Sequence, residues 1–262
     1  MTFMFNEHSY KSLFGFTRKC EIEIILRNED HDGIPIVIAP GFLTENQEDW
    51  LNYFEERIKA PLIYVKWRSS SITRMTQKSL TSLLPSLAIP FIGSYRVPAL
   101  LSTIYSSWSN AAKEASLAGR DLSNFLNDIW DDDDKAIFIG HSLGVRVITE
   151  AMRTLKHDNV LTSVSIAGAI DSEEYEKRIL AIKSTRIIKH TNMYSDNDAV
   201  LKWLYRIGEL NYKKDPIGLV RCDLDNVINY KSSIGHTEYH EKYIFSKTIL
   251  EIHSNAIKSF NI

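Results

Sequence analysis

The alternation of apolar and polar residues predicts several strands in the first part of the chain. Residues 18–27 partly alternate, as in a half-exposed strand, and the turn-rich segment NEDHDG leads into the continuous apolar run IPIVIA at 34–39. Apolar residues then recur at helical spacing from Trp50 to Ile58, and LIYVKW after Pro61 is another short apolar run. The predicted order is strand, buried strand, helix, strand.

A strand, helix, strand order continues through the middle of the chain. Apolar residues from Trp108 to Ile129 form one stripe of a long helix, and the acidic run DDDD after it is typical of a solvated loop. The next expected elements are a buried strand at 136–140, a helix at 143–155 and strands at 160–168 and 185–195. Strands joined by helices in this way make a parallel sheet.

No repeat or low-complexity linker divides the 262 residues. We therefore expect a single α/β domain over residues 1–262, with a mostly parallel sheet flanked by helices and a C-terminal helix that includes Tyr243 and Ile257. The most apolar stretch, 80–101, is interrupted by prolines, a glycine and an arginine. It is typical of an apolar helical lid or insert, around residues 70–107, and not of a membrane-spanning helix.

Charge and cysteine content argue against several classes of protein. Lysine and arginine number 31 against 33 acidic residues, and no basic cluster stands out, so nucleic acid is not an expected partner. Cys20 and Cys222 match no metal or redox spacing. The N-terminus lacks the apolar segment and cleavage site of a signal peptide, so we expect a cytoplasmic location.

The strongest chemical signal is the sequence Gly140-His141-Ser142-Leu143-Gly144 between an expected strand and an expected helix. This G-x-S-x-G pattern is typical of a nucleophile elbow, in which small residues allow a cramped turn that exposes the serine hydroxyl. An N-cap serine on a glycine-rich turn is the alternative. The strand and helix around the pattern favour Ser142 as a nucleophile.

A nucleophilic serine needs a base and an acid that orients the base, in the chain order Ser, Asp or Glu, His. Asp196 and Asp198 follow the strand at 185–195, and we expect Asp198 to be the acid, with Asp196 as the alternative. The alternative for either aspartate is an acid that only stabilises the start of a following helix. His236, after Gly235 in a polar loop, is the expected base.

We expect neither a metal pair nor a catalytic His141 near this site. His236 and His240 have the spacing of a metal pair, but no third ligand or H-E-x-x-H pattern accompanies them, so no metal or cofactor is expected. His141 adjoins the serine, and its side chain should point away from the hydroxyl and pack.

An oxyanion hole requires two N–H donors. The residue after the nucleophile, Leu143, supplies one candidate, and Phe42 after Gly41 at the end of an early strand supplies the other. An ordinary turn glycine is the alternative for Gly41.

Several blocks of sequence make the chain resemble the α/β-hydrolase superfamily, and more closely the largely uncharacterised family related to transmembrane and coiled-coil domain-containing hydrolases. These blocks are IPIVIAPGFLTENQEDW at 34–50, VKW at 65–67, WSNAAKEASLAGRDLSNFL at 108–126, IFIGHSLGVRVI at 137–148, NMYSDNDAVLKWLYR at 192–206 and GHTEY at 235–239. The resemblance implies an α/β-hydrolase fold with Ser142, Asp198 and His236 as its triad. The long extra domains and membrane segments of many relatives are not found in this chain, so membrane residence is not inferred from them.

We therefore expect a serine hydrolase that cleaves carboxylic esters through an acyl-enzyme. Lipid-like esters are favoured if the apolar stretch 80–101 lines the site, although a buried hairpin explains the same composition. Peripheral membrane contact would fit a lipid substrate, and the oligomeric state is left open. Two other hypotheses stay open: a non-catalytic protein that binds a partner with this fold, and an antibacterial lipase toxin with the same chemistry.

Overall fold

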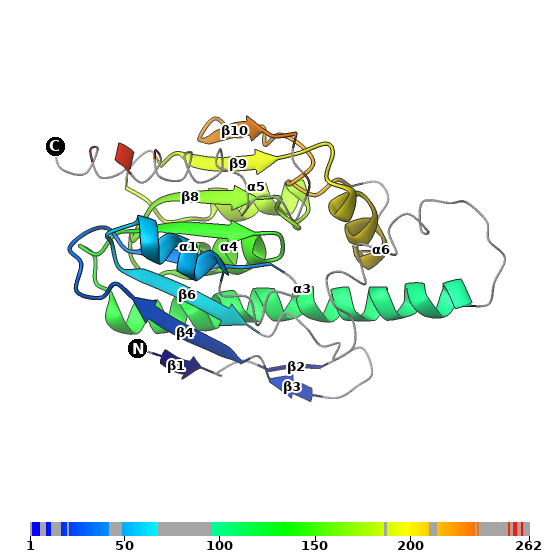
Figure 1. Ribbon diagram of the computed structural model, residues 1–262, viewed down its shortest axis with the longest axis horizontal. Coiled ribbons are helices and arrows are strands. Elements are labelled where there is room, and N and C mark those ends of the chain that lie inside the picture. Colours follow the sequence, from blue (N-terminus) through cyan, green and yellow to red (C-terminus); the bar gives the residue numbers. More distant parts are fainter. Residues whose placement is uncertain are drawn as a thin grey trace.

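The computed structural model describes most of the chain (Figure 1). The described residues are 2–5, 9–11, 17–19, 21–41, 49–67, 96–185, 188–209, 214–233 and 235, with 251, 254, 255 and 258 near the C-terminus. All statements below refer to these residues.

Eight strands form one sheet in the order β1-β4-β6-β5-β7-β8-β9-β10. β4 runs antiparallel to both β1 and β6, and the remaining neighbours are parallel. The strands are β1 (Thr2–Phe5), β4 (Ile22–Arg27), β5 (Ile36–Ala39), β6 (Leu62–Trp67), β7 (Ala136–His141), β8 (Val160–Ile166), β9 (His190–Tyr194) and β10 (Val227–Lys231). A separate hairpin pairs β2 (Ser9–Lys11) with β3 (Thr17–Lys19).

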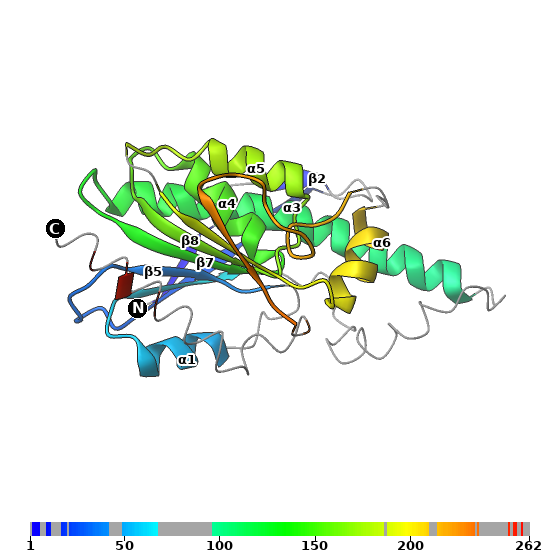
Figure 2. The same ribbon diagram turned by 90° about the horizontal axis from the view of Figure 1, so that it is seen from above.

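Helices cover both faces of the sheet because its central strands are apolar on both sides. Every residue of β5 and β7 is buried. The long helix α3 (Arg96–Ile129), α4 (Gly144–Thr154) and α5 (Ser172–Leu180) lie over one face, and α1 (Asp49–Arg57) lies over the other (Figure 2). The result is a three-layer α/β architecture.

The carboxyl ends of the parallel strands all lie along one edge of the sheet. A π-helical turn, η1 (Leu201–Tyr205), and α6 (Arg206–Glu209) follow β9 at this edge, where the first half of α3 also projects beyond the strands (Figure 1). In open α/β sheets this edge is where ligands bind.

Most of the expected elements are confirmed, with changes at their boundaries. The expected strand at 18–27 divides into β3 and β4, and the expected strand at 185–195 is shortened to β9. The expected helix from Trp108 begins earlier, at Arg96, so the end of the expected 70–107 insert belongs to α3. Residues 68–95 of that insert, and most of the expected C-terminal helix, lie outside the described residues.

Candidate active site

Ser142 occupies a strained turn between β7 and α4. Its φ is +54°, in the left-handed region that costs a side-chain-bearing residue about 1–2 kcal/mol. The turn is held by backbone hydrogen bonds: Ser142 N–H donates to Ile166 O at 2.9 Å, and Ser142 O accepts from Val145 N–H at 3.2 Å and Ala169 N–H at 3.0 Å. Strain that the surrounding structure enforces in this way is common at functional sites.

The glycine after the serine is required by close packing of the turn against β5. A Cβ on Gly144 would lie 2.1 Å from Ala39 O and 2.6 Å from Pro40 O, closer than any real Cβ contact. Because a side chain cannot fit there, the spacing of this glycine from Ser142 has a direct steric cause.

The backbone at the end of β5 lies beside the serine. A Cβ on Gly41 would be 2.8 Å from Ser142 Cβ and 2.9 Å from His141 Nδ1. The buried His141 side chain therefore lies against Gly41, as its packing role predicts. Phe42, the expected second oxyanion donor, lies outside the described residues. Leu143, the other candidate, is buried and leads directly into α4.

The two candidate acids differ sharply in environment. Asp198 is fully buried after β9, and its Oδ1 accepts a hydrogen bond from Leu201 N–H at 2.9 Å. Asp196 is exposed and forms an ion pair with Lys231 at 2.8 Å. The hydrogen bond from Lys231 keeps the pKa of Asp196 below its usual value. Asp198 is thus buried at the carboxyl edge of the sheet, whereas Asp196 faces solvent.

The strand register brings the acid segment and the segment before His236 to the same place. β9 pairs with β10 in parallel up to Tyr194 and Lys231, and Ser232 N–H then donates to Tyr194 O at 2.8 Å. The chain after β10 thus leaves the sheet beside the residues that follow β9. His236 itself lies outside the described residues.

The loop that contains Gly218 is hydrogen-bonded to the backbone just after β9. Ser195 N–H donates to Gly218 O at 2.9 Å, and Gly218 N–H donates to Gly168 O at 2.9 Å. Gly168 belongs to the turn after β8 that also contacts Ser142 through Ala169. This loop therefore connects the backbone before Asp198 with the turn at Ser142, which the sequence pattern did not indicate.

The segment that follows Asp198 contains the π-helical turn η1, a rare conformation that is frequent at functional sites. Hydrophobic spacing does not separate a π turn from an α turn. Asp198 acts at its start as an N-terminal cap through the bond to Leu201.

A cavity of about 360 Å³ opens between α3, α4 and α6. Its described lining includes Lys113, Leu117, Arg146 and Glu209. It therefore lies beside α4, on the face of the sheet that α3 covers (Figure 2), and Ser142 and Asp198 are not among its described lining residues.

Among the described residues, no group of three or more His, Cys, Asp or Glu side chains is arranged to hold a metal ion. The pair His236 and His240 lies outside them. None of the described helices combines the length and apolar character needed to cross a membrane.

The sequence matches, over residues 49–252, the family described as "Protein of unknown function (DUF726)". The chain belongs to this family. The description of this family gives no activity, as the resemblance to a largely uncharacterised family led us to expect. Among curated proteins, no match was found.

Similar solved structures include several hydrolases. The acyl-protein thioesterase 2 of Zea mays superposes with a TM-score of 0.51 at 13% identity, covering 90% of this chain and 98% of the other. Alpha/beta hydrolase domain-containing protein 10 from mouse gives 0.48 at 12% identity, covering 92% and 95%. An esterase of Pyrobaculum calidifontis gives 0.46 at 11% identity, covering 99% and 85%. The likeness to the maize protein and the strand order show the α/β-hydrolase fold, which confirms the expected fold class.

Proposed function

We propose that this chain is a serine hydrolase that cleaves carboxylic esters, with Ser142 as its nucleophile. The observation that carries the proposal is the positive φ of Ser142 on a turn whose neighbouring glycine admits no side chain. An ordinary N-cap serine needs neither feature, whereas a nucleophile elbow needs both.

The proposed roles follow from the chemistry of acyl transfer. His236 accepts the proton of the Ser142 hydroxyl while its oxygen attacks the ester carbonyl, and Asp198 stabilises the imidazolium that forms. The N–H groups of Leu143 and Phe42 donate hydrogen bonds to the oxyanion. His236 then protonates the leaving alcohol, and water hydrolyses the acyl-enzyme by the same steps in reverse.

Two observations support the choice of acid and the readiness of the site. Asp198 is completely buried, so its charge acts through a medium that screens it much less than water does. The turn of Ser142 is held by three backbone hydrogen bonds, which keep the nucleophile in place before substrate arrives.

The substrate preference for lipid-like esters rests on the apolar composition of residues 80–101. A lid or wall of such residues near Ser142 would bury an acyl chain at about 0.8 kcal/mol per methylene. This gain predicts that catalytic efficiency rises with acyl length until the pocket is filled.

A chain-length series tests both parts of the proposal. Wild type and Ser142→Ala are assayed on p-nitrophenyl esters from acetate to palmitate, and on a phospholipid, with unfolding temperatures measured in parallel. We expect hydrolysis by the wild type alone, with kcat/KM rising with chain length, and equal folding of the two proteins. Equal activity of both would remove Ser142 from the mechanism, and no activity of either would favour the non-catalytic binding hypothesis.

A further inference from the structure

The guanidinium of Arg146, in the first turn of α4, contacts two other segments of the chain. Its Nε donates to Ala169 O at 2.7 Å, and its Nη2 pairs with Glu209 Oε1. Ala169 N–H in turn donates to Ser142 O at 3.0 Å. Arg146 therefore stabilises the position of Ala169, whose N–H is bonded to Ser142.

Glu209 lies at the far end of the segment that Asp198 begins. Its Oε1 also accepts a hydrogen bond from Trp108 Nε1 of α3 at 3.2 Å. The Trp108 ring packs edge-on against buried Tyr205, with 6.0 Å between ring centroids. The segment is thus capped by Asp198 at its start, through Leu201, and fastened by Glu209 at its end.

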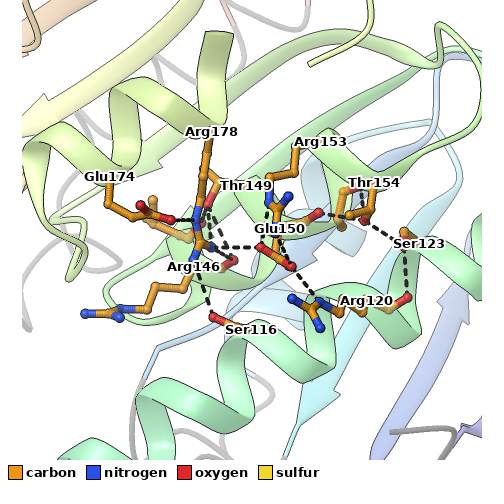
Figure 3. A network of polar contacts seen from close by, with 12 residues as sticks. Ser116, Arg120, Ser123, Arg146, Thr149, Glu150, Arg153, Thr154, Glu174 and Arg178 are labelled. Atoms are coloured by element: carbon orange, nitrogen blue, oxygen red, sulfur yellow. Dashed lines mark hydrogen bonds and ion pairs between the residues drawn. The ribbon is translucent and has the colours of Figure 1, made fainter. Parts of the chain in front are cut away.

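Separate contacts fix α4 in place without the Arg146 side chain. Arg178 of α5 donates from Nη1 to the backbone oxygen of Arg146 at 3.1 Å. It also pairs with the buried Glu150 at 3.4 Å and with Glu174 at 2.9 Å (Figure 3). The Arg146 guanidinium points away from this network (Figure 3). Loss of the Glu209 contact should therefore leave the packing of α4 on α5 intact.

The ion pair between Arg146 and Glu209 is largely shielded from solvent, so it can hold α4 and the end of α6 at a fixed separation. The side chain of Arg146 is 13% exposed and that of Glu209 is 28% exposed, unlike a freely solvated surface pair. A guanidinium with its Nε bound to a carbonyl and its Nη2 bound to a carboxylate has a fixed orientation, because its donors form a rigid fork.

We propose that Arg146 and Glu209 are positioning residues that set the spacing between the turn at Ser142 and the segment 198–209, which begins with Asp198. Neither side chain touches the reacting atoms in this account. They act by holding Ala169 against Ser142 on one side and the end of the Asp198 segment on the other. This inference rests on the proposed hydrolase function.

Glu209→Ala and Glu209→Gln test the proposal, with Glu55→Gln as a matched control. Glu55 pairs with Arg27 at 3.8 Å, at the opposite end of the strands, where Arg27 pairs in register with the first residue of β6. The assays are the rate constant of fluorophosphonate labelling, kcat and KM on a p-nitrophenyl ester across pH, and the unfolding temperature.

For Glu209→Ala we expect kcat and the labelling rate constant to fall about tenfold to a hundredfold with KM unchanged, since small displacements of reacting groups cost this much. The acid limb of the pH profile should shift to lower pH, because a displaced Asp198 stabilises the imidazolium of His236 less. Glu209→Gln should lose less, because its amide oxygen still accepts from Trp108 and Arg146. Glu55→Gln should match the wild type.

Each outcome has a distinct meaning. Wild-type kcat and pH profile in folded Glu209 variants, with an active wild type, would overturn this inference alone. An equal fall in Glu55→Gln would attribute the effect to general destabilisation and overturn it as well. No labelling of the wild type would remove the proposed function and this inference together. If Glu209→Ala does not fold, Glu209→Gln carries the test, with a smaller fall in kcat expected and wild-type kcat again contradicting it.

Discussion

Replacing Asp198 with Asn removes a charge from the site while keeping its shape. The asparagine Oδ1 still accepts the hydrogen bond from Leu201 N–H, which spans 2.9 Å, so the start of the π-helical segment is preserved. A neutral amide, however, neither stabilises the imidazolium of His236 nor selects its reactive tautomer. The same change in a serine protease triad lowers kcat about 10⁴-fold. For Asp198→Asn we expect kcat/KM to fall about 10³- to 10⁴-fold, which is roughly 4–5.5 kcal/mol.

Asp196→Asn is the matched control, because it makes the same substitution two residues away. Asp196 is exposed and pairs with Lys231, and we expect its loss to change ester hydrolysis less than about twofold, since surface ion pairs contribute little. Both variants are assayed on one p-nitrophenyl ester, with circular dichroism to verify folding. The reverse pattern would make Asp196 the acid, and full activity of both would refute a catalytic carboxylate here.

Three further predictions concern stability. The free energy of unfolding of Ser142→Gly should be about 0.5–1 kcal/mol higher than that of Ser142→Ala, because glycine adopts the positive φ without strain and this outweighs its greater unfolded-state entropy. Equal urea midpoints for the two variants would contradict the strained turn. Gly144→Ala should destabilise by about 1–3 kcal/mol, because its Cβ would meet Ala39 O at 2.1 Å; an unchanged midpoint would show that the turn can widen. Burial lowers the pKa of His190 from 6.5 to about 4. The contribution of neutral His190 to stability is therefore complete above pH 6.5 and is lost as pH falls toward 4, by roughly 3 kcal/mol. The unfolding free energy of His190→Gln should depend less steeply on pH over this range, and identical slopes for the variant and the wild type would refute the assignment.

The turn at Ser142 was predictable because its sequence signals are local, although the contacts that require Gly144 are with Ala39 and Pro40, which are distant in sequence. A continuous apolar run must be buried on both faces, and a glycine two residues after a serine indicates a crowded turn, so β7, Ser142 and α4 follow from neighbouring residues. The position of Asp198 was predictable for a related reason, since parallel strands bring their carboxyl ends to one edge.

Features that depend on distant residues were not predictable from the pattern. Asp196 pairs with Lys231 of β10, and the pairing of β10 with β9 was not anticipated, so the different environments of Asp196 and Asp198 could not be predicted. The contact of Arg146 with Glu209 joins residues far apart in sequence, and hydrophobic spacing contains no signal for it. The π-helical turn η1 was missed because π and α turns share nearly the same apolar spacing.

The central claim is that Ser142 is an activated nucleophile, and fluorophosphonate labelling followed by peptide mass spectrometry tests it most directly. The probe forms a stable adduct only with a serine whose hydroxyl is activated, and it requires no knowledge of the substrate. We predict one adduct, on the peptide that contains Ser142, which is absent in Ser142→Ala and strongly reduced in Asp198→Asn. An unlabelled, folded wild-type protein, or an adduct on another serine, would contradict the account.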